Sequence, residues 1–324
     1  MTELADDYTE LLIEAAHAAG LHPAAIVQPA DHHVELNGIR FHYLDWGNAH
    51  LPHVVLLHGG GLTAHTWDLT ALLLRERYHL IALDQRGHGD TEWTPAAQSG
   101  RDPAELMLED TREFLDHLDH DGVALVGMSL GGLNAIRYAA RDPDGLDAVV
   151  IVDVAPESLL ACPQGLREFE RATANLERFE DFLACAQRFL PDRPEAQLRY
   201  SLMHSLRRGE HGRYAWKHDP RVLPAAGAPE LRERECESLR AAVRDIRAPS
   251  LVLRGAQSDV LTQDVAERMA KDMFDARLAV IPRARHNVHT DNPADFARAL
   301  DRFLCDVLPE LEDEAAPGDL PRAE

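Results

Sequence analysis

The sequence predicts an α/β protein in which a doubly wound parallel sheet is interrupted by an inserted helical cap. Short apolar segments rich in Val and Ile alternate with helical patterns of about 10–15 residues. Strands this apolar are typical of a parallel sheet covered on both faces. Between about residues 156 and 247 the pattern is helical, with no convincing strand. This stretch therefore indicates an insertion between two strands of the sheet.

Composition restricts the class of protein further. The chain has 324 residues, which allows two domains at most, and its formal net charge is −22. Such a charge repels nucleic acids and anionic membrane surfaces, so neither is expected as a partner. The four cysteines are widely spaced, which argues against a disulfide framework or a cysteine-rich zinc site and suits the reducing cytoplasm. No apolar run is long enough for a transmembrane helix.

The elements can be predicted in chain order. Residues 1–30 are predicted to form a helical extension that begins with an amphipathic helix. A signal peptide is not expected, because the N-terminus is acidic and lacks the basic residues that precede the apolar core of such a peptide. Asn37-Gly38 then predicts a hairpin between two strands. Further strands are predicted at 53–59, 78–84, 122–127, 146–153, 249–255 and 276–282. Helices are predicted at 63–75, 103–118, 130–140, 263–271 and 293–308.

These elements divide the chain into four parts. The core is expected to comprise residues 31–155 and 248–308, and the cap residues 156–247. Two stretches of the cap, 179–190 and 231–243, carry its clearest helical patterns. Residues 309–324 are acidic and contain proline, which indicates a solvated tail. The position of the insertion favours a lid over an active site, although a plain helical subdomain would give the same pattern.

A nucleophilic serine is indicated by Gly127-Met128-Ser129-Leu130-Gly131, which matches G-x-S-x-G between a predicted strand and a predicted helix. A sharp turn there would raise the Ser129 hydroxyl above the sheet. It would also direct the Leu130 N–H toward developing negative charge. The alternative is a glycine-rich turn in which the serine is only a helix cap.

A serine hydroxyl needs a base, and the base needs an orienting acid, in the chain order Ser, acid, His. His286 follows the strand at 276–282 and is the predicted base, with His289 as the alternative. Asp259 follows the strand at 249–255 and is the predicted acid, with Asp153 as the alternative. No third ligand accompanies His286 and His289, so no metal is expected there.

Glycines 59–61 follow another predicted strand and would let backbone N–H groups approach a reacting carbonyl. We expect Gly60 and Leu130 to donate the two hydrogen bonds of an oxyanion hole, with Gly61 as the alternative donor. Trp67, near this loop, and Trp216, in the insertion, are candidates for lining a substrate pocket together with Gly61. The loop at 84–90 is expected to make structural hydrogen bonds, with no chemistry assigned to it.

Taken together, five blocks resemble the α/β-hydrolase superfamily over roughly residues 32–308. They are LLHGGG (56–61), DQRGHGD (84–90), GMSLGG (127–132), GAQSDV (255–260) and RARHNVHTDNP (283–293). The resemblance implies a mostly parallel sheet of eight strands, a Ser–His–Asp triad of Ser129, His286 and Asp259, and no cofactor. Arg285 departs from the family pattern, because many relatives have glycine before the histidine.

Three functions are compatible with these residues. The first is a serine hydrolase that cleaves a small-to-medium, largely uncharged carboxylic ester or lactone through an acyl-enzyme. The second is a hydrolase of a carbon–carbon bond in a ring-fission diketone, which uses the same residues. The third is a small-molecule sensor of the same fold with little turnover. The sequence favours the first and gives no specific substrate.

Overall fold

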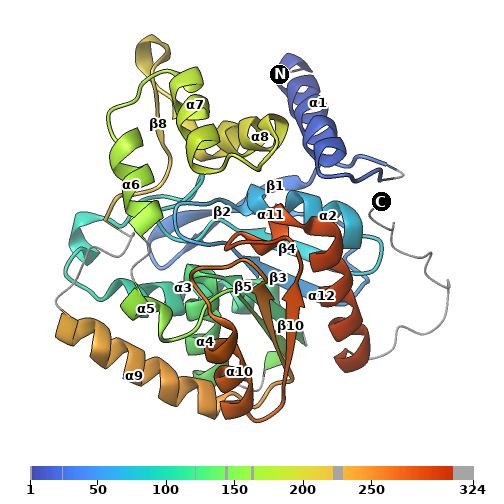
Figure 1. Ribbon diagram of the computed structural model, residues 1–324, viewed down its shortest axis with the longest axis vertical. Coiled ribbons are helices and arrows are strands. Elements are labelled where there is room, and N and C mark those ends of the chain that lie inside the picture. Colours follow the sequence, from blue (N-terminus) through green and yellow to red (C-terminus); the bar gives the residue numbers. More distant parts are fainter. Residues whose placement is uncertain are drawn as a thin grey trace.

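A central sheet with helices on both of its faces organises the molecule (Figure 1). The computed structural model describes residues 2–23, 25–120, 122–142, 145–161, 164–221 and 229–308. The predicted acidic tail, 309–324, lies outside the described residues. Eight strands form the sheet in the order β1-β2-β4-β3-β5-β6-β9-β10, which confirms the predicted fold class. The pairs β1–β2 and β2–β4 are antiparallel, and the remaining pairs are parallel.

The strands lie where the apolar segments of the sequence predict them. Their bounds are β1 Ala30–Leu36, β2 Ile39–Asp45, β3 His53–Leu57, β4 His79–Leu83, β5 Val123–Met128, β6 Leu146–Val152, β9 Ser250–Gly255 and β10 Ala276–Ile281. The turn between β1 and β2 has positive φ at both Asn37 (49°) and Gly38 (74°), as a two-residue type I′ hairpin requires.

Two hydrophobic layers explain why the parallel strands are apolar throughout. Val54 and Leu56 of β3 belong to the layer covered by α2 (Asp68–Leu74) and α12 (Pro293–Val307). Val55 and Leu57 point to the opposite layer. That layer is covered by α3 (Pro103–Leu118), α4 (Leu130–Arg141) and α10 (Gln263–Asp272). Both faces of the sheet are therefore buried.

The predicted insertion folds as two separate pieces. The short helix α5 (Ser158–Ala161) packs against α9 (Pro229–Asp245). The next three helices lie together above one end of the sheet in Figure 1: α6 Gln164–Thr173, α7 Phe179–Phe189 and α8 Glu195–Ser205. They enclose a small hydrophobic cluster that includes Phe182 and Leu198. In contrast, α9 (Pro229–Asp245) packs against α4, and its buried Leu239 and Val243 belong to a layer of the sheet.

A short hairpin inside the insertion was not expected from the sequence. Strands β7 (Leu206–Arg208) and β8 (Tyr214–Trp216) pair antiparallel and have only three residues each. Segments this short cannot display the alternation that identifies a strand. The hairpin positions Trp216 against the aromatic side chains of α6 and α7.

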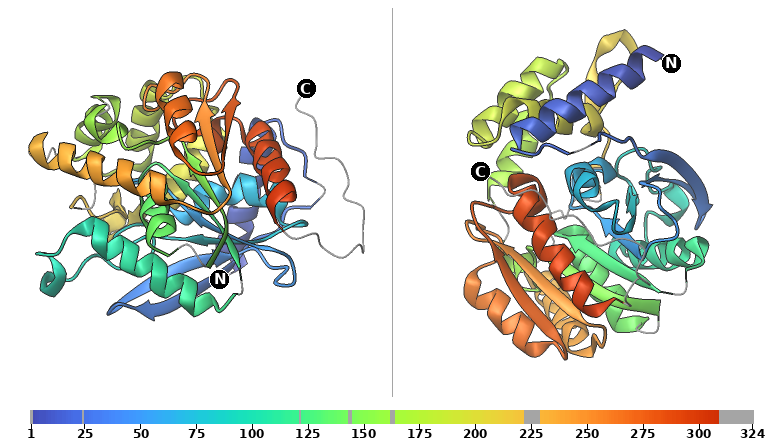
Figure 2. Two further views of the ribbon diagram at one scale, coloured as in Figure 1. Left: turned by 90° about the horizontal axis from the view of Figure 1, so that it is seen from below. Right: turned by 90° about the vertical axis from the view of Figure 1, so that its right-hand side faces the viewer.

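The N-terminal helix α1 (Thr2–Ala18) packs against α8 of the insertion (Figure 2). Its Leu12 and Ala16 are fully buried and join the hydrophobic layer on the α2 and α12 side of the sheet. The helix thus connects the insertion with the sheet. Within the described part of the chain, no helix combines the length and the apolar character needed to cross a membrane.

Candidate active site

Ser129 occupies a tight turn between β5 and α4. Its backbone has φ 51° and ψ −113°, a conformation that costs about 1–3 kcal/mol for a residue with a side chain. Only glycine fits at the flanking position 127, because a Cβ there would lie 2.2 Å from the carbonyl oxygen of Gly131. Close packing of the turn against α4 thus explains the G-x-S-x-G spacing.

His286 faces this serine from the loop that follows β10. Its Nε2 lies 3.1 Å from the Ser129 Oγ, so the serine hydroxyl can donate to the imidazole. The neighbouring Arg285 points away from Ser129. Its guanidinium donates to the carboxylate of Asp192, and its backbone N–H donates to Asp291. A bulky residue before the histidine therefore leaves the imidazole in position to accept the serine proton.

The acid that contacts His286 is Asp153, which corrects the prediction of Asp259. The Nδ1 of His286 lies 2.8 Å from the Asp153 Oδ2, and Asp153 follows β6 with its side chain fully buried. Asp259 is exposed to solvent. The preceding residue, Ser258, is buried and directs its hydroxyl to Asp153, so Asp259 is directed outward instead.

The Asp153 carboxylate is held by three donors. The Gly255 N–H donates to its Oδ1 at 2.9 Å, while the Ser258 hydroxyl and His286 both donate to its Oδ2. A buried carboxylate needs such partners to remain charged. Sequence reasoning missed Ser258. The available signal was a second polar residue in the loop after β9, one position before the predicted acid.

The glycine loop after β3 lies directly against the serine turn. A Cβ at Gly59 would be 2.5 Å from the Met128 Sδ and 3.3 Å from the Ser129 Cβ. Gly60 follows, and Leu130 is the first residue of α4, where a backbone N–H has no acceptor within the helix. These two predicted donors therefore come from segments that adjoin Ser129. Gly61, the alternative donor, has φ 75°.

His58 connects this loop with the rest of the core and is fully buried. Its Nε2 accepts a hydrogen bond from the Gln85 N–H at 3.0 Å, and its Nδ1 donates to the Gly59 carbonyl at 2.8 Å. Its own carbonyl accepts from the Gly131 N–H at 3.1 Å. Both ring nitrogens are thus used, and His58 positions the glycine loop against α4.

The loop at 84–90 makes structural contacts. Asp84 is buried and accepts hydrogen bonds from His42 at 2.7 Å and from the Ala64 N–H at 2.7 Å. Burial opposes ionisation, but the hydrogen bond from His42 holds the pKa of Asp84 well below its usual value. His88 donates to the Arg86 carbonyl, and burial lowers its pKa to about 3, so it is neutral.

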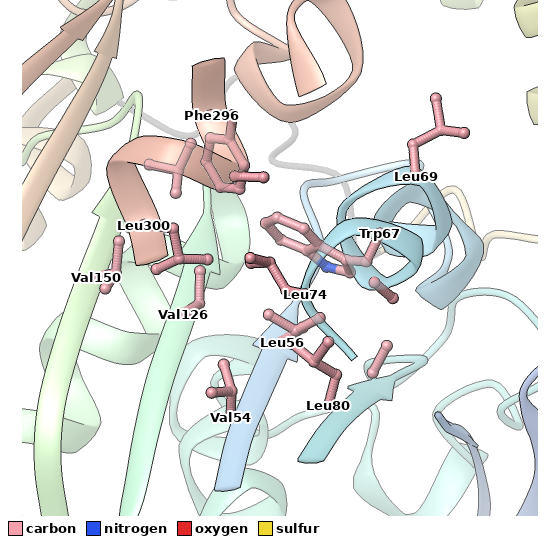
Figure 3. Packing of buried hydrophobic residues seen from close by; sticks show 14 of the residues in the cluster. Val54, Leu56, Trp67, Leu69, Leu74, Leu80, Val126, Val150, Phe296 and Leu300 are labelled. Carbon is pink, nitrogen blue, oxygen red and sulfur yellow. The ribbon is translucent and has the colours of Figure 1, made fainter. Parts of the chain in front are cut away.

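Trp67 and His289 belong to the hydrophobic core. Trp67 is fully buried, and Figure 3 shows its indole among Leu74, Leu56 and Phe296. The prediction that Trp67 lines a substrate pocket is therefore wrong. The His289 ring packs against this indole in a tilted arrangement with 4.2 Å between ring centroids, and burial lowers the pKa of His289 to about 3. It is directed away from Ser129, because its Nε2 contacts the Thr66 Oγ1 at 2.8 Å.

Trp216, the other predicted pocket residue, is partly exposed on β8. Its ring packs edge-on against Phe182 at 5.3 Å, and its indole N–H donates to the Thr173 hydroxyl at 3.2 Å. A cavity lies between α8 and the loop after Gly61. Its lining includes Leu62 and Asn287, which directly follow Gly61 and His286. This small cavity is therefore lined by chain neighbours of the glycine loop and of His286.

Comparisons with known proteins agree with this architecture. A family model described as the alpha/beta hydrolase family matches residues 54–299. The chain is 32% identical to the esterase Rv0045c of Mycobacterium tuberculosis over 316 residues, which cover 93% of this chain and 96% of that protein. A solved structure of this esterase superposes with a TM-score of 0.71 at 27% identity, over 92% of this chain and 98% of the other.

More distant relatives carry other hydrolytic activities. The 3-oxoadipate enol-lactonase 2 of Acinetobacter baylyi is 24% identical over 82% of this chain and 93% of its own length. The 2-hydroxymuconate semialdehyde hydrolase of a Pseudomonas strain is 28% identical over 83% of this chain and 92% of its own length. These three relatives are thus named as hydrolytic enzymes of different substrates.

Proposed function

Because the chain belongs to the α/β-hydrolase family and is a hydrolase, we propose that it cleaves a carboxylic ester or lactone with Ser129 as nucleophile. One observation carries this proposal: a continuous hydrogen-bonded line runs from Ser129 through His286 to Asp153, with separations of 3.1 and 2.8 Å. Such a line lowers the barrier to attack, because the base accepts the serine proton while its other nitrogen is held by the acid.

In the first half of the reaction, the Ser129 oxygen attacks the carbonyl carbon and His286 accepts the hydroxyl proton. The carbonyl oxygen becomes an oxyanion, to which the N–H groups of Gly60 and Leu130 donate. One such donor typically contributes about 2.7–4 kcal/mol to transition-state stabilisation. His286 then protonates the leaving alkoxide, and the acyl group stays on Ser129.

In the second half, His286 removes a proton from water, which attacks the acyl-enzyme. The same two N–H groups stabilise the second oxyanion, and the Ser129 oxygen leaves with the proton that His286 returns. Asp153 keeps Nδ1 protonated throughout and stabilises the imidazolium that forms twice in each turnover. Because Asp153 is fully buried, water does not compete for its carboxylate.

We propose a small-to-medium, largely uncharged substrate. The chain has a net charge of −22, which disfavours highly anionic molecules. The cavity next to the glycine loop has apolar lining residues, among them Leu62 and Leu69, which favour apolar acyl or alcohol groups. The similarity to a mycobacterial esterase supports ester cleavage in particular.

The test is Ser129→Ala, assayed with p-nitrophenyl esters of increasing acyl length and with a lactone panel. We expect kcat to fall by at least about 10³-fold while the fold is retained, because the nucleophile alone is removed. A fluorophosphonate should label the wild type and leave this variant unlabelled. Ser99→Ala, at an exposed serine, is the matched control. Retention of most activity by Ser129→Ala would end the proposal.

A second candidate is hydrolysis of a carbon–carbon bond in a ring-fission diketone. It is favoured by the similarity to 2-hydroxymuconate semialdehyde hydrolase over most of both chains. The same three side chains would serve, so the distinction lies in the substrate. Turnover of a vinylogous 1,5-diketone with a kcat/KM above that of every ester in the panel would assign this activity instead.

A further inference from the structure

Three histidines meet at the edge of the sheet where the parallel strands begin. His53 opens β3 and His79 opens β4, and the two residues are direct partners in the β3–β4 register. Their Nδ1 atoms are 2.9 Å apart. His120, which follows α3, stacks on the His53 ring with 3.4 Å between centroids. One ring nitrogen from each of the three lies within 4.8 Å of the others.

Asp45 fixes the orientation of one of these rings. The Nε2 of His79 lies 2.9 Å from the Asp45 Oδ1 and donates to it, because a carboxylate only accepts. The lone pair of His79 is then on Nδ1, which accepts a hydrogen bond from the His53 Nδ1 at 2.9 Å. A metal ion would replace the proton between these two nitrogens, and His53 would carry its proton on Nε2 instead. A carboxylate on the far nitrogen of a histidine is the usual support of a metal-binding imidazole, since it sets the tautomer and raises the basicity of the ligand.

We propose that His53, His79 and His120 bind a divalent transition-metal ion, with zinc as the expected ion and water as a fourth ligand. Imidazole nitrogens suit zinc, at about 2.0–2.1 Å from the ion. Two such ligands at a tetrahedral ion would be about 3.3 Å apart. The Nδ1 atoms of His53 and His79 therefore need to separate by only a few tenths of an ångström. His120 enters by rotation of its side chain away from the His53 ring.

A metal ion can reach this cluster from solvent. His53 and His120 are both partly exposed, whereas His79 is buried. An ion can thus approach from solvent and be held by a ring that the protein already orients.

This site is remote from the proposed chemistry. Ser129 and Asp153 follow the carboxyl ends of β5 and β6, whereas His53 and His79 stand at the opposite ends of their strands. The five residues of β3 separate His53 from the glycine loop by more than about 13 Å, at about 3.3 Å per residue. Bound metal would join β3 and β4 to the segment between α3 and β5. We therefore expect metal to raise stability and to leave ester hydrolysis unchanged.

A second cluster, with two imidazoles and a carboxylate, could also attract a metal ion and must be distinguished from the proposed site. His65, Asp68 and His204 also bring ligand atoms within 4.8 Å of one another. Here the Asp68 Oδ2 already accepts hydrogen bonds from Tyr8 at 3.0 Å, from His65 at 2.8 Å and from Tyr200. His65 and His204 line the cavity beside the proposed active site, so metal bound there would interfere with activity.

The experiment uses full-length, chelator-treated protein from which any polyhistidine tag has been removed. Co²⁺ is titrated and its visible absorption recorded, and the Tm is measured with and without Zn²⁺. We expect one tight Co²⁺ with tetrahedral absorption, a higher Tm with Zn²⁺, and unchanged kcat/KM. His120→Ala, at a partly exposed position, should abolish the spectrum. Asp45→Asn should weaken binding by about 10–100-fold, as loss of such a supporting carboxylate does.

Two further variants separate the possible sites. His50→Ala removes an exposed histidine from the loop before β3 and should bind Co²⁺ as the wild type does. His204→Ala should also retain the signal. Wild-type binding by His120→Ala would overturn the proposal. So would a signal that disappears in His204→Ala and accompanies inhibition of activity, because it would assign the ion to the cluster beside the active site.

Discussion

The loops after β6 and β9 each present an aspartate at the same edge of the sheet, and the two residues differ in almost every other respect. Asp153 is fully buried and accepts hydrogen bonds from Gly255, Ser258 and His286. Asp259 is exposed. The strands that carry them are neighbours in the sheet, so either loop begins close to the base. Position along the chain therefore does not decide which carboxylate orients His286.

Burial of the side chain and the hydrogen-bond donors around it decide which carboxylate orients His286. A carboxylate that fixes an imidazole must keep its charge away from water and be held by hydrogen bonds that compensate for the lost hydration. In the loop after β9 the inward position belongs to Ser258, which has a donor hydroxyl, and the acidic residue that follows it faces solvent. The loop after β9 thus contributes hydrogen-bond donors to Asp153 of the other loop and does not itself provide the carboxylate that contacts His286.

The largest expected effect comes from removal of each carboxylate in turn. We expect Asp153→Asn to lower kcat/KM by about 10³–10⁴-fold, because the amide no longer favours the tautomer with a proton on Nδ1 and no longer stabilises the imidazolium. Asp259→Asn should leave kcat/KM within about twofold. Steady-state hydrolysis of a p-nitrophenyl ester measures both.

Asn is nearly isosteric with Asp, so the matched pair also controls for folding. Circular dichroism and Tm should show that both variants are folded before their rates are compared. The assignment of Asp153 would have to be abandoned if Asp259→Asn proved the more damaging change, since the exposed residue would then orient the base.

A smaller effect is expected from Ser258→Ala, which removes one of the three donors to Asp153. A hydrogen bond to a charged group contributes about 1.5–3 kcal/mol, so we expect kcat to fall by about 10–100-fold with little change in KM. Ser250→Ala is the matched control, because Ser250 is also buried, lies in β9 and donates its hydroxyl to the Ala248 carbonyl. Equal kcat values for the two variants would show that Ser258 has only a structural role.

The sheet was predictable because its physical cause is local. Each parallel strand is buried on both faces, as Val54 and Val55 show by entering opposite layers, and it therefore appears as a continuous apolar run. The Asn37-Gly38 turn was equally predictable, since its backbone conformation suits few residue pairs. The hairpin of β7 and β8 was missed because three-residue strands carry no periodic pattern.

The site was predictable only in part. Ser129 lies in a turn that glycines must flank, and this requirement is visible in the sequence. The choice between Asp153 and Asp259 depends on which side chain is buried beside His286, which is a tertiary property. The position of Trp67 could not be predicted from the sequence for the same reason. An aromatic residue near the glycine loop could face either the site or the core, and α12 packs over it.

The two histidines after β10, His286 and His289, can be compared in the same way as the two aspartates. A substitution of His289 gives the smallest expected effect. His286 is partly exposed and contacts Ser129, whereas His289 is fully buried, and its pKa is lowered to about 3. The unfolded chain binds a proton at position 289 below pH 6.5, and the folded protein does not. Stability is therefore lost as the pH falls from 6.5 toward 3, by about 1.4 kcal/mol per pH unit for this group.

His289→Gln should remove that dependence. Between pH 7.5 and pH 5, the wild type should lose about 2 kcal/mol more unfolding free energy than the variant, because pH 5 lies 1.5 units below 6.5. Urea denaturation at the two pH values measures the difference, and His50→Gln, at an exposed site, should behave as the wild type. Because Gln can still contact the Thr66 hydroxyl, kcat should stay within a few-fold. An identical pH dependence in wild type and His289→Gln would mean that this histidine is protonated in the folded protein, in conflict with its burial against Trp67.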